Sequence, residues 1–145
     1  MSANTDLIKL YSTRILALAT DVPHPGRLDA PDGTATERSP ICGSQVIVDV
    51  AMSDGKIVDF AQDVKACALG QASAAVVGAN VIGRSLSEVE AAYAELSAML
   101  KDNGPAPTAP FEDLIVLTPA IDYGNRHASI LLALKATIAA CKAAA

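Results

Sequence analysis

The sequence predicts an α+β fold, in which a small antiparallel sheet, led by a hairpin over about residues 41–64, packs against four helices. Apolar residues alternate with polar ones on one side of an Asp-Gly pair, which is typical of strands joined by a tight turn. Elsewhere apolar residues recur at helical spacing. With 145 residues, the chain is long enough for one core and short for two, so we expect a single domain over residues 1–145.

The N-terminal part predicts one helix followed by a long loop. A helix over about residues 5–20 follows from apolar residues at helical spacing, which are Leu7, Leu10, Tyr11, Ile15 and Leu18. Residues 21–40 contain four prolines, two glycines and many polar side chains. We therefore expect a surface loop there, and loops of this length are often functional.

The middle of the chain predicts the hairpin. Val46, Val48, Val50 and Met52 alternate with polar residues up to Asp54-Gly55, and β-branched and aromatic residues follow as far as Val64. A type I′ turn needs positive φ at both central residues, and Asp-Gly is among the pairs that adopt it most readily. A third short strand is compatible with the sequence but is not clearly marked in it.

Three further helices are expected over residues 68–79, 86–101 and 125–143. The first is rich in Ala, Ser and Gly, which permits close approach to its neighbours, and Ser73 is expected to be one of its packing residues. Ser85 and Glu88 form a capping box at the start of the second. Between the second and third helices, residues 111–117 are expected to form a short element.

Composition and charge exclude several classes of partner. The net charge is −5, and the Lys and Arg residues are scattered singly, so no basic stripe is available for nucleic acid or for anionic lipid. Asp6 and Lys9 interrupt what would have to be the apolar part of a signal peptide, and no later apolar run is expected to span a membrane. We therefore expect a cytoplasmic protein without nucleic-acid or membrane partners.

The positions of two of the three cysteines predict a site for thiol or metal chemistry. Cys42 and Cys67 mirror each other across the Asp54-Gly55 turn, so an unbulged hairpin would place their Cα atoms about 4.5–5.5 Å apart. Thiolates suit zinc and iron-sulfur clusters, and the expected helix start after Cys67 favours its thiolate form. The other interpretation is that both are small buried apolar residues, as free cysteines often are.

Several segments, in order, resemble the NifU-like, IscU-type family of iron-sulfur cluster scaffolds. They are Pro40-Ile-Cys-Gly43, the hairpin with Asp54-Gly55, Lys65-Ala-Cys-Ala-Leu-Gly-Gln-Ala-Ser73-Ala-Ala and Val81-Ile-Gly-Arg84. Leu10-Tyr11 with Pro25-Gly-Arg-Leu28 resembles the entry segment of the family, and His127-Ala-Ser-Ile-Leu131 resembles its C-terminal H-C-S-I-L. The resemblance covers nearly the whole chain.

This resemblance implies the scaffold fold and a scaffold without catalytic residues. Family members assemble a [2Fe-2S] cluster from iron and from sulfur delivered by a cysteine desulfurase, and pass it to apo-proteins; a subgroup binds zinc at the same cysteines. Cys42 and Cys67 match the first two ligand cysteines, and His127 matches a histidine beside the third. Two positions depart from the pattern: the third cysteine is Ala128, and the aspartate that follows Cys-Gly is Ser44.

The expected ligands of the cluster, iron or zinc are therefore Cys42, Cys67 and His127. Cys141 lies 14 residues after His127, roughly 21 Å along one helix, so we expect it to be a packing residue. Two other functions stay open at this point: a degenerate relative that acts as an adaptor or regulator of a desulfurase, and a redox protein that uses a Cys42–Cys67 disulfide. A homo-oligomer is also compatible with the sequence.

Overall fold

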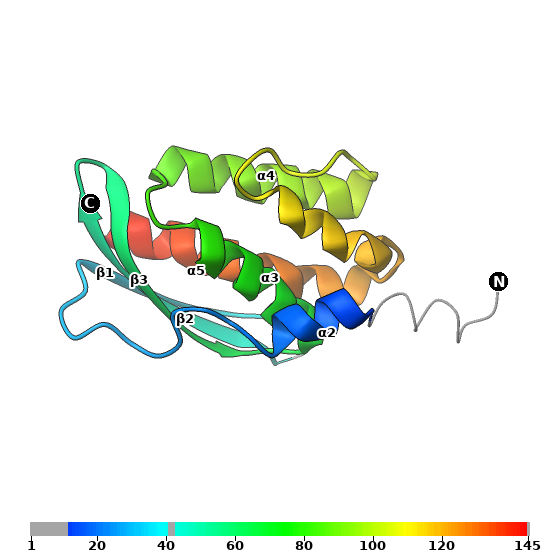
Figure 1. Cartoon of the computed structure of the whole chain (residues 1–145), viewed down its shortest axis with the longest axis horizontal. Helices are drawn as coiled ribbons and strands as arrows, with labels where there is room; N and C mark the ends of the chain where they lie inside the picture. The colour runs from blue at the N-terminus through cyan, green and yellow to red at the C-terminus, as the bar shows by residue number, and fades with distance from the viewer. Residues whose placement is uncertain (1–11, 41–42, 145) are drawn as a thin grey trace.

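The structure, a computed structural model, describes residues 12–40 and 43–144. Its three-stranded antiparallel sheet has the order β1-β2-β3, and the helices gather on one face of it (Figure 1). This is the predicted α+β class. The elements are α2 (Thr13–Ala19), β1 (Gly33–Arg38), β2 (Gln45–Ser53), β3 (Lys56–Lys65), α3 (Ala68–Asn80), α4 (Leu86–Asp102), the 3-10 helices η1 (Glu112–Asp122) and η2 (Gly124–Arg126), and α5 (His127–Ala144).

The hairpin of β2 and β3 turns at Asp54 and Gly55 as predicted. Both residues have positive φ, 52° and 75°, as a type I′ turn requires. Beyond the turn a bulge shifts the register: Met52 pairs with Ile57, but Ala51 pairs with Asp59. Strand β3 therefore carries one extra residue. The pairing predicted from the sequence, which assumes no bulge, is wrong by one residue beyond that point.

Strand β1 corrects the expectation of a loop over residues 21–40. It pairs antiparallel with β2, from Gly33 opposite Val50 to Arg38 opposite Gln45. Its buried or half-buried side faces α5 and carries small residues such as Gly33 and Ala35. A Cβ added to Gly33 would collide with the backbone oxygen of Ala140, so α5 lies too close to this edge for larger residues.

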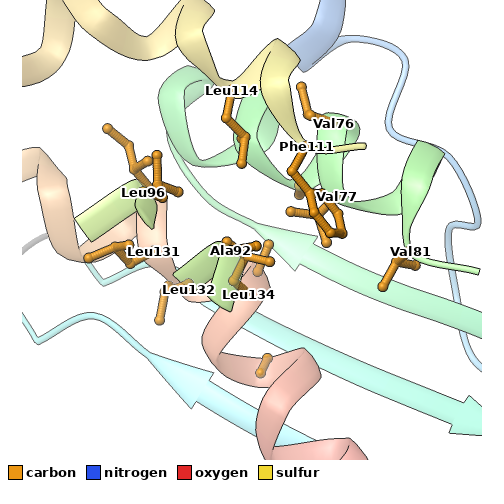
Figure 2. Packing of buried hydrophobic residues seen from close by; sticks show 14 of the residues in the cluster. Val76, Val77, Val81, Ala92, Leu96, Phe111, Leu114, Leu131, Leu132 and Leu134 are labelled. Carbon is orange, nitrogen blue, oxygen red and sulfur yellow. The ribbon is translucent and has the colours of Figure 1, made fainter. Parts of the chain in front are cut away.

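The core lies between the sheet and the helices. Helix α5 packs on β1 and β2 on one side and against α3 and α4 on the other (Figure 1). Figure 2 shows side chains of α3, α4, α5 and η1 meeting in this core, among them Val77, Leu96, Leu114 and Leu134, which are all fully buried. Ser73 is also fully buried and donates a hydrogen bond to the backbone oxygen of Ile130 at 2.7 Å, which confirms its expected packing role.

The observed helix boundaries agree in part with those predicted from the sequence. The described part of the first predicted helix is α2, and residues 5–11 lie outside the described residues. Helix α4 begins with the predicted capping box, since the Ser85 hydroxyl accepts from the Glu88 N–H and the Glu88 carboxylate accepts from the Ser85 N–H. The short element after Phe111 is the 3-10 helix η1, and α5 begins at His127, two residues later than expected.

The segment before β1 is fixed to the sheet through Asp49. This residue lies on β2, on the face opposite the helices, yet it is fully buried. Its carboxylate accepts hydrogen bonds from the Arg27 guanidinium at 2.7 and 3.1 Å, from the Leu28 N–H at 3.0 Å and from the Thr34 hydroxyl at 2.6 Å. Burial opposes ionisation, but these hydrogen bonds outweigh it and hold the pKa of Asp49 below its ordinary value.

By length and composition alone, Gly124–Ala144 could cross a membrane, which was not expected from the sequence. In the apolar 18-residue stretch of this segment, 56% is buried inside the fold. Because α5 packs between the sheet and the other helices, the core accounts for its apolar character.

Candidate metal and cluster site

Cys67 lies where β3 ends and α3 begins. It is the N-cap residue of α3, with extended backbone (φ −65°, ψ 170°), and its side chain caps no backbone N–H. The thiol is half-buried. A sulfur in this place is held by two regular elements and is still partly accessible, as a ligand that exchanges its metal must be.

Two buried serines stand behind the Cys67 sulfur. The Ser129 hydroxyl, in the first turn of α5, lies 3.6 Å from the Cys67 Sγ and 3.0 Å from the Ser44 hydroxyl. Ser44 and Ser129 are 3% and 1% exposed. The three side chains therefore form a hydrogen-bonded row that joins the loop before β2, the start of α3 and the start of α5.

Gly70 makes this convergence sterically feasible. A Cβ at this position would lie 2.6 Å from the Ser129 Oγ and 2.9 Å from the Ala66 Cβ. Real Cβ atoms do not approach so closely, so any larger residue would push α3 away from α5. The glycine thus allows Ser129 to reach the Cys67 sulfur.

His127 is half-buried at the first position of α5. Its Nε2 lies 2.9 Å from the Ala120 carbonyl oxygen and 3.2 Å from that of Ile121. Because carbonyl oxygens only accept, Nε2 carries the proton and donates to both. A metal-binding histidine commonly donates its second ring N–H to a backbone carbonyl, so this geometry leaves Nδ1 as the nitrogen that can coordinate.

The other predicted ligand, Cys42, lies outside the described residues. The register beyond the bulge, carried to the open end of the hairpin, sets residue 43 rather than residue 42 opposite Cys67. Within residues 12–40 and 43–144 there is no group of three or more His, Cys, Asp or Glu side chains that could hold a metal ion. The ligand set of Cys42, Cys67 and His127 therefore stays a prediction.

The two departures from the family pattern have a structural consequence. Ser44, at the aspartate position, is almost fully buried, and its hydroxyl lies 3.0 Å from that of Ser129. Ala128, at the third cysteine position, is half-buried and offers only a methyl group. Cys141 is no substitute: it is 3% exposed, and burial raises its pKa to about 11. Its packing role is confirmed.

The sequence did not reveal Ser44 and Ser129 as partners of Cys67. Ser129 follows the His127-Ala128 pair directly, but a helical residue at that place can face in any of several directions. A usable signal was the substitution at residue 44 itself, because a short polar residue where a carboxylate is expected requires a new hydrogen-bond partner.

Comparison with known proteins decides the family. The sequence model described as the NifU-like N terminal domain matches residues 10–118, three quarters of the chain. The chain belongs to the NifU-like N-terminal domain family. Members of this family are scaffolds of iron-sulfur cluster assembly, so the resemblance noted in the sequence is confirmed. Among curated proteins, no sequence matches the chain.

Solved structures agree with this membership. A nitrogen-fixing NifU-like protein (N-terminal) from Brucella abortus is 44% identical, with a TM-score of 0.92 over 95% of this chain and 96% of that one. A putative iron-sulfur cluster assembly scaffold protein for the SUF system from Fervidobacterium islandicum AW-1 is 22% identical, with a TM-score of 0.79 over 92% and 98% of the two chains. The second comparison shows a shared fold.

Proposed function

We propose that this NifU-like chain holds an iron-sulfur cluster, or iron or zinc with persulfide sulfur, for a short time at a cysteine pair and passes the cargo to apo-proteins. The observation that carries the proposal is the placement of Cys67: a half-buried thiol at a helix start, beside the first turn of α5. The cargo would come from a cysteine desulfurase in the cytoplasm, and no step needs a catalytic residue of this chain.

The ligands we propose are Cys67, Cys42 and the Nδ1 of His127. A [2Fe-2S] cluster is usually bound by four protein ligands and zinc by three or four, so this set is short by at least one for the cluster. Few ligands favour a weakly bound cargo, and weak binding suits transfer. A [2Fe-2S] cluster would therefore be held only transiently.

Anaerobic reconstitution tests this proposal. The chain is incubated with ferrous iron, cysteine, a desulfurase and dithiothreitol as reductant, and visible absorption is read together with iron and sulfide content. We expect a sulfur-to-iron charge-transfer band that Cys67→Ala and Cys42→Ala each abolish. Cys141→Ala is the matched control, because that thiol is buried in the core, and it should leave the iron and sulfide content unchanged. Iron and sulfide retained by Cys67→Ala would contradict the proposal.

A second function has a specific observation in its favour. With Ser44 turned inward and a methyl group at Ala128, the chain has lost two groups of the family site while keeping the fold. A degenerate member of this kind would act as an adaptor or regulator of a desulfurase. If the chain is an adaptor, wild type and Cys67→Ala should change the turnover of the desulfurase to the same extent. If wild type delivers a cluster to apo-ferredoxin and Cys67→Ala does not, the adaptor function is excluded.

A further inference from the structure

A hollow of about 330 Å³ lies between α4, α5 and the end of β1. Its floor is apolar and is formed by Leu131 and Leu132, which are 5% and 2% exposed. Three of the residues that line it, Arg38, Lys101 and Lys135, carry cationic side chains. The half-buried Tyr93 lines it as well. Its volume lies at the lower end of the range of small-molecule sites.

The charge of this hollow is opposite to that of the chain. The sequence has 16 acidic residues and 11 Lys and Arg, yet three of those 11 line the hollow and no acidic residue does. Lys135 forms an ion pair at 3.4 Å with the half-buried Glu37, which is not among the lining residues. Within the described part of the chain, no ion pair engages Arg38 or Lys101. Cations gathered in one concave site repel each other unless an anion joins them.

We infer that this hollow binds a small organic anion that carries two or more carboxylates. Arginine and lysine head groups can donate charge-assisted hydrogen bonds to carboxylates, and three of the lining residues carry them. The floor of Leu131 and Leu132 matches a short carbon skeleton, which inorganic phosphate lacks. Apolar contact below and charged contact around the edge is the pattern of small-molecule sites.

The position of the hollow links it to the candidate metal site. His127 and Ala128 line the hollow, while the next residue, Ser129, faces Cys67. The first turn of α5 thus borders both sites, and His127 belongs to both because it is also one of the proposed ligands. The inference depends only on the shape and charge of the hollow, and it is tested on metal-free protein. A failure of anion binding therefore leaves the scaffold proposal intact, and a failure of reconstitution leaves the anion site intact.

Titration calorimetry on the full chain tests the inference, with protein freed of metal on a chelating resin and with tricarballylate as the probe. We expect one site with a dissociation constant of roughly 10 µM to 1 mM, weakening as NaCl rises. Arg38→Gln combined with Lys101→Gln should weaken binding by about tenfold or more. Both side chains are exposed, so this double variant should fold, as circular dichroism can verify.

The matched control is Lys56→Gln combined with Lys142→Gln, which removes the same charge outside the hollow. It should change the dissociation constant by less than about twofold, since screened surface charges act weakly at distance. Equal weakening by both double variants would overturn the inference, as would the absence of binding at millimolar tricarballylate. Phosphate binding as tight as tricarballylate, or binding of a Glu-Glu peptide but not of tricarballylate, would overturn the assignment to a small polycarboxylate.

Discussion

The Ser129 hydroxyl stands between the Cys67 sulfur, at 3.6 Å, and the Ser44 hydroxyl, at 3.0 Å. Residue 44 is the family's aspartate position, and residue 129 follows its third cysteine position. The row therefore connects one altered position, Ser44, and the neighbour of the other, Ser129, to the ligand candidate Cys67. Because Ser44 and Ser129 are almost fully buried, the hydrogen bond between their hydroxyls satisfies polar groups that water hardly reaches.

Ser129→Ala should destabilise the fold. It removes one hydroxyl from the row and takes a hydrogen-bond partner from the buried Ser44, so we expect the free energy of unfolding to fall by about 1–2 kcal/mol. Urea denaturation followed by circular dichroism measures this. Ser53→Ala is the control at an exposed position and should change stability by less than about 0.5 kcal/mol.

The double variant Ser44→Ala with Ser129→Ala sharpens this test. Since both single changes break the same hydrogen bond, the effect of the double variant should be smaller than the sum of the two. Strict additivity of the two effects would show that the 3.0 Å contact contributes nothing to stability.

Gly70→Ala should separate α3 from α5. The new Cβ would meet the Ser129 Oγ at 2.6 Å, and we expect a loss of about 1–3 kcal/mol in unfolding free energy from overpacking. Gly124→Ala is the matched control, because a Cβ there meets nothing within 4 Å and the backbone needs no positive φ. That variant should be neutral or slightly stabilised. Similar losses at both glycines would mean that helix approach at Gly70 is not the cause.

The hairpin turn and the capping box were predictable because each rests on local chemistry. Asp54-Gly55 adopts positive φ, and Ser85 with Glu88 satisfies the first N–H groups of a helix, whatever the rest of the chain does. Strand β1 was not predictable in this way. Its inward positions are Gly33, Ala35 and Glu37, none of them a large apolar residue, and α5 passes too close to Gly33 for any side chain there. The alternation that marks a strand is therefore hidden by a tertiary contact.

Of the candidate site, the sequence predicted the place of Cys67 and not its neighbours. Cys67 at a helix start follows from the sequence pattern, and the structure confirms that place. Its neighbours depend on how α5 is rotated and on a bulge in β3, and neither leaves a local signal. Cys42 and His127 were added as ligands by the family resemblance, and that part of the set stays a prediction.

Asp49→Asn should weaken the fold and change its response to acid. The pKa of Asp49 is depressed in the folded state, so its ionised form stabilises the fold above its unfolded pKa of about 3.9, and this stability is lost as pH falls through the folded value. We expect a loss of about 1–3 kcal/mol at pH 7, because hydrogen bonds from Arg27, Leu28 and Thr34 are weakened together.

Unfolding free energies measured between pH 7 and pH 2.5 check the sign. Wild type should lose stability below about pH 4 more steeply than Asp49→Asn, which has no carboxylate to protonate there. Asp54→Asn is the control, since that residue is exposed and asparagine tolerates its positive φ. If Asp49→Asn lost stability in acid as steeply as wild type, the acid response would belong to other carboxylates.

Ala128→Cys should strengthen metal binding. It places a thiol at the family's third ligand position, one residue from His127 and from Ser129, and it adds a third thiolate to the proposed set. We expect zinc affinity, measured by competition with a chromophoric chelator, to rise by about tenfold or more, because thiolates are favoured zinc ligands. The gain should disappear when Cys67→Ala is added, since both sulfurs would have to bind the same ion.

Ala91→Cys is the control for an added thiol, because residue 91 is exposed on α4, outside the candidate site. It should leave zinc affinity unchanged. An equal gain in both cysteine variants would indicate nonspecific thiol binding. A gain in Ala128→Cys that survives the loss of Cys67 would place the metal on the other side of α5, in the hollow lined by His127 and Ala128, and would remove Cys67 from the ligand set.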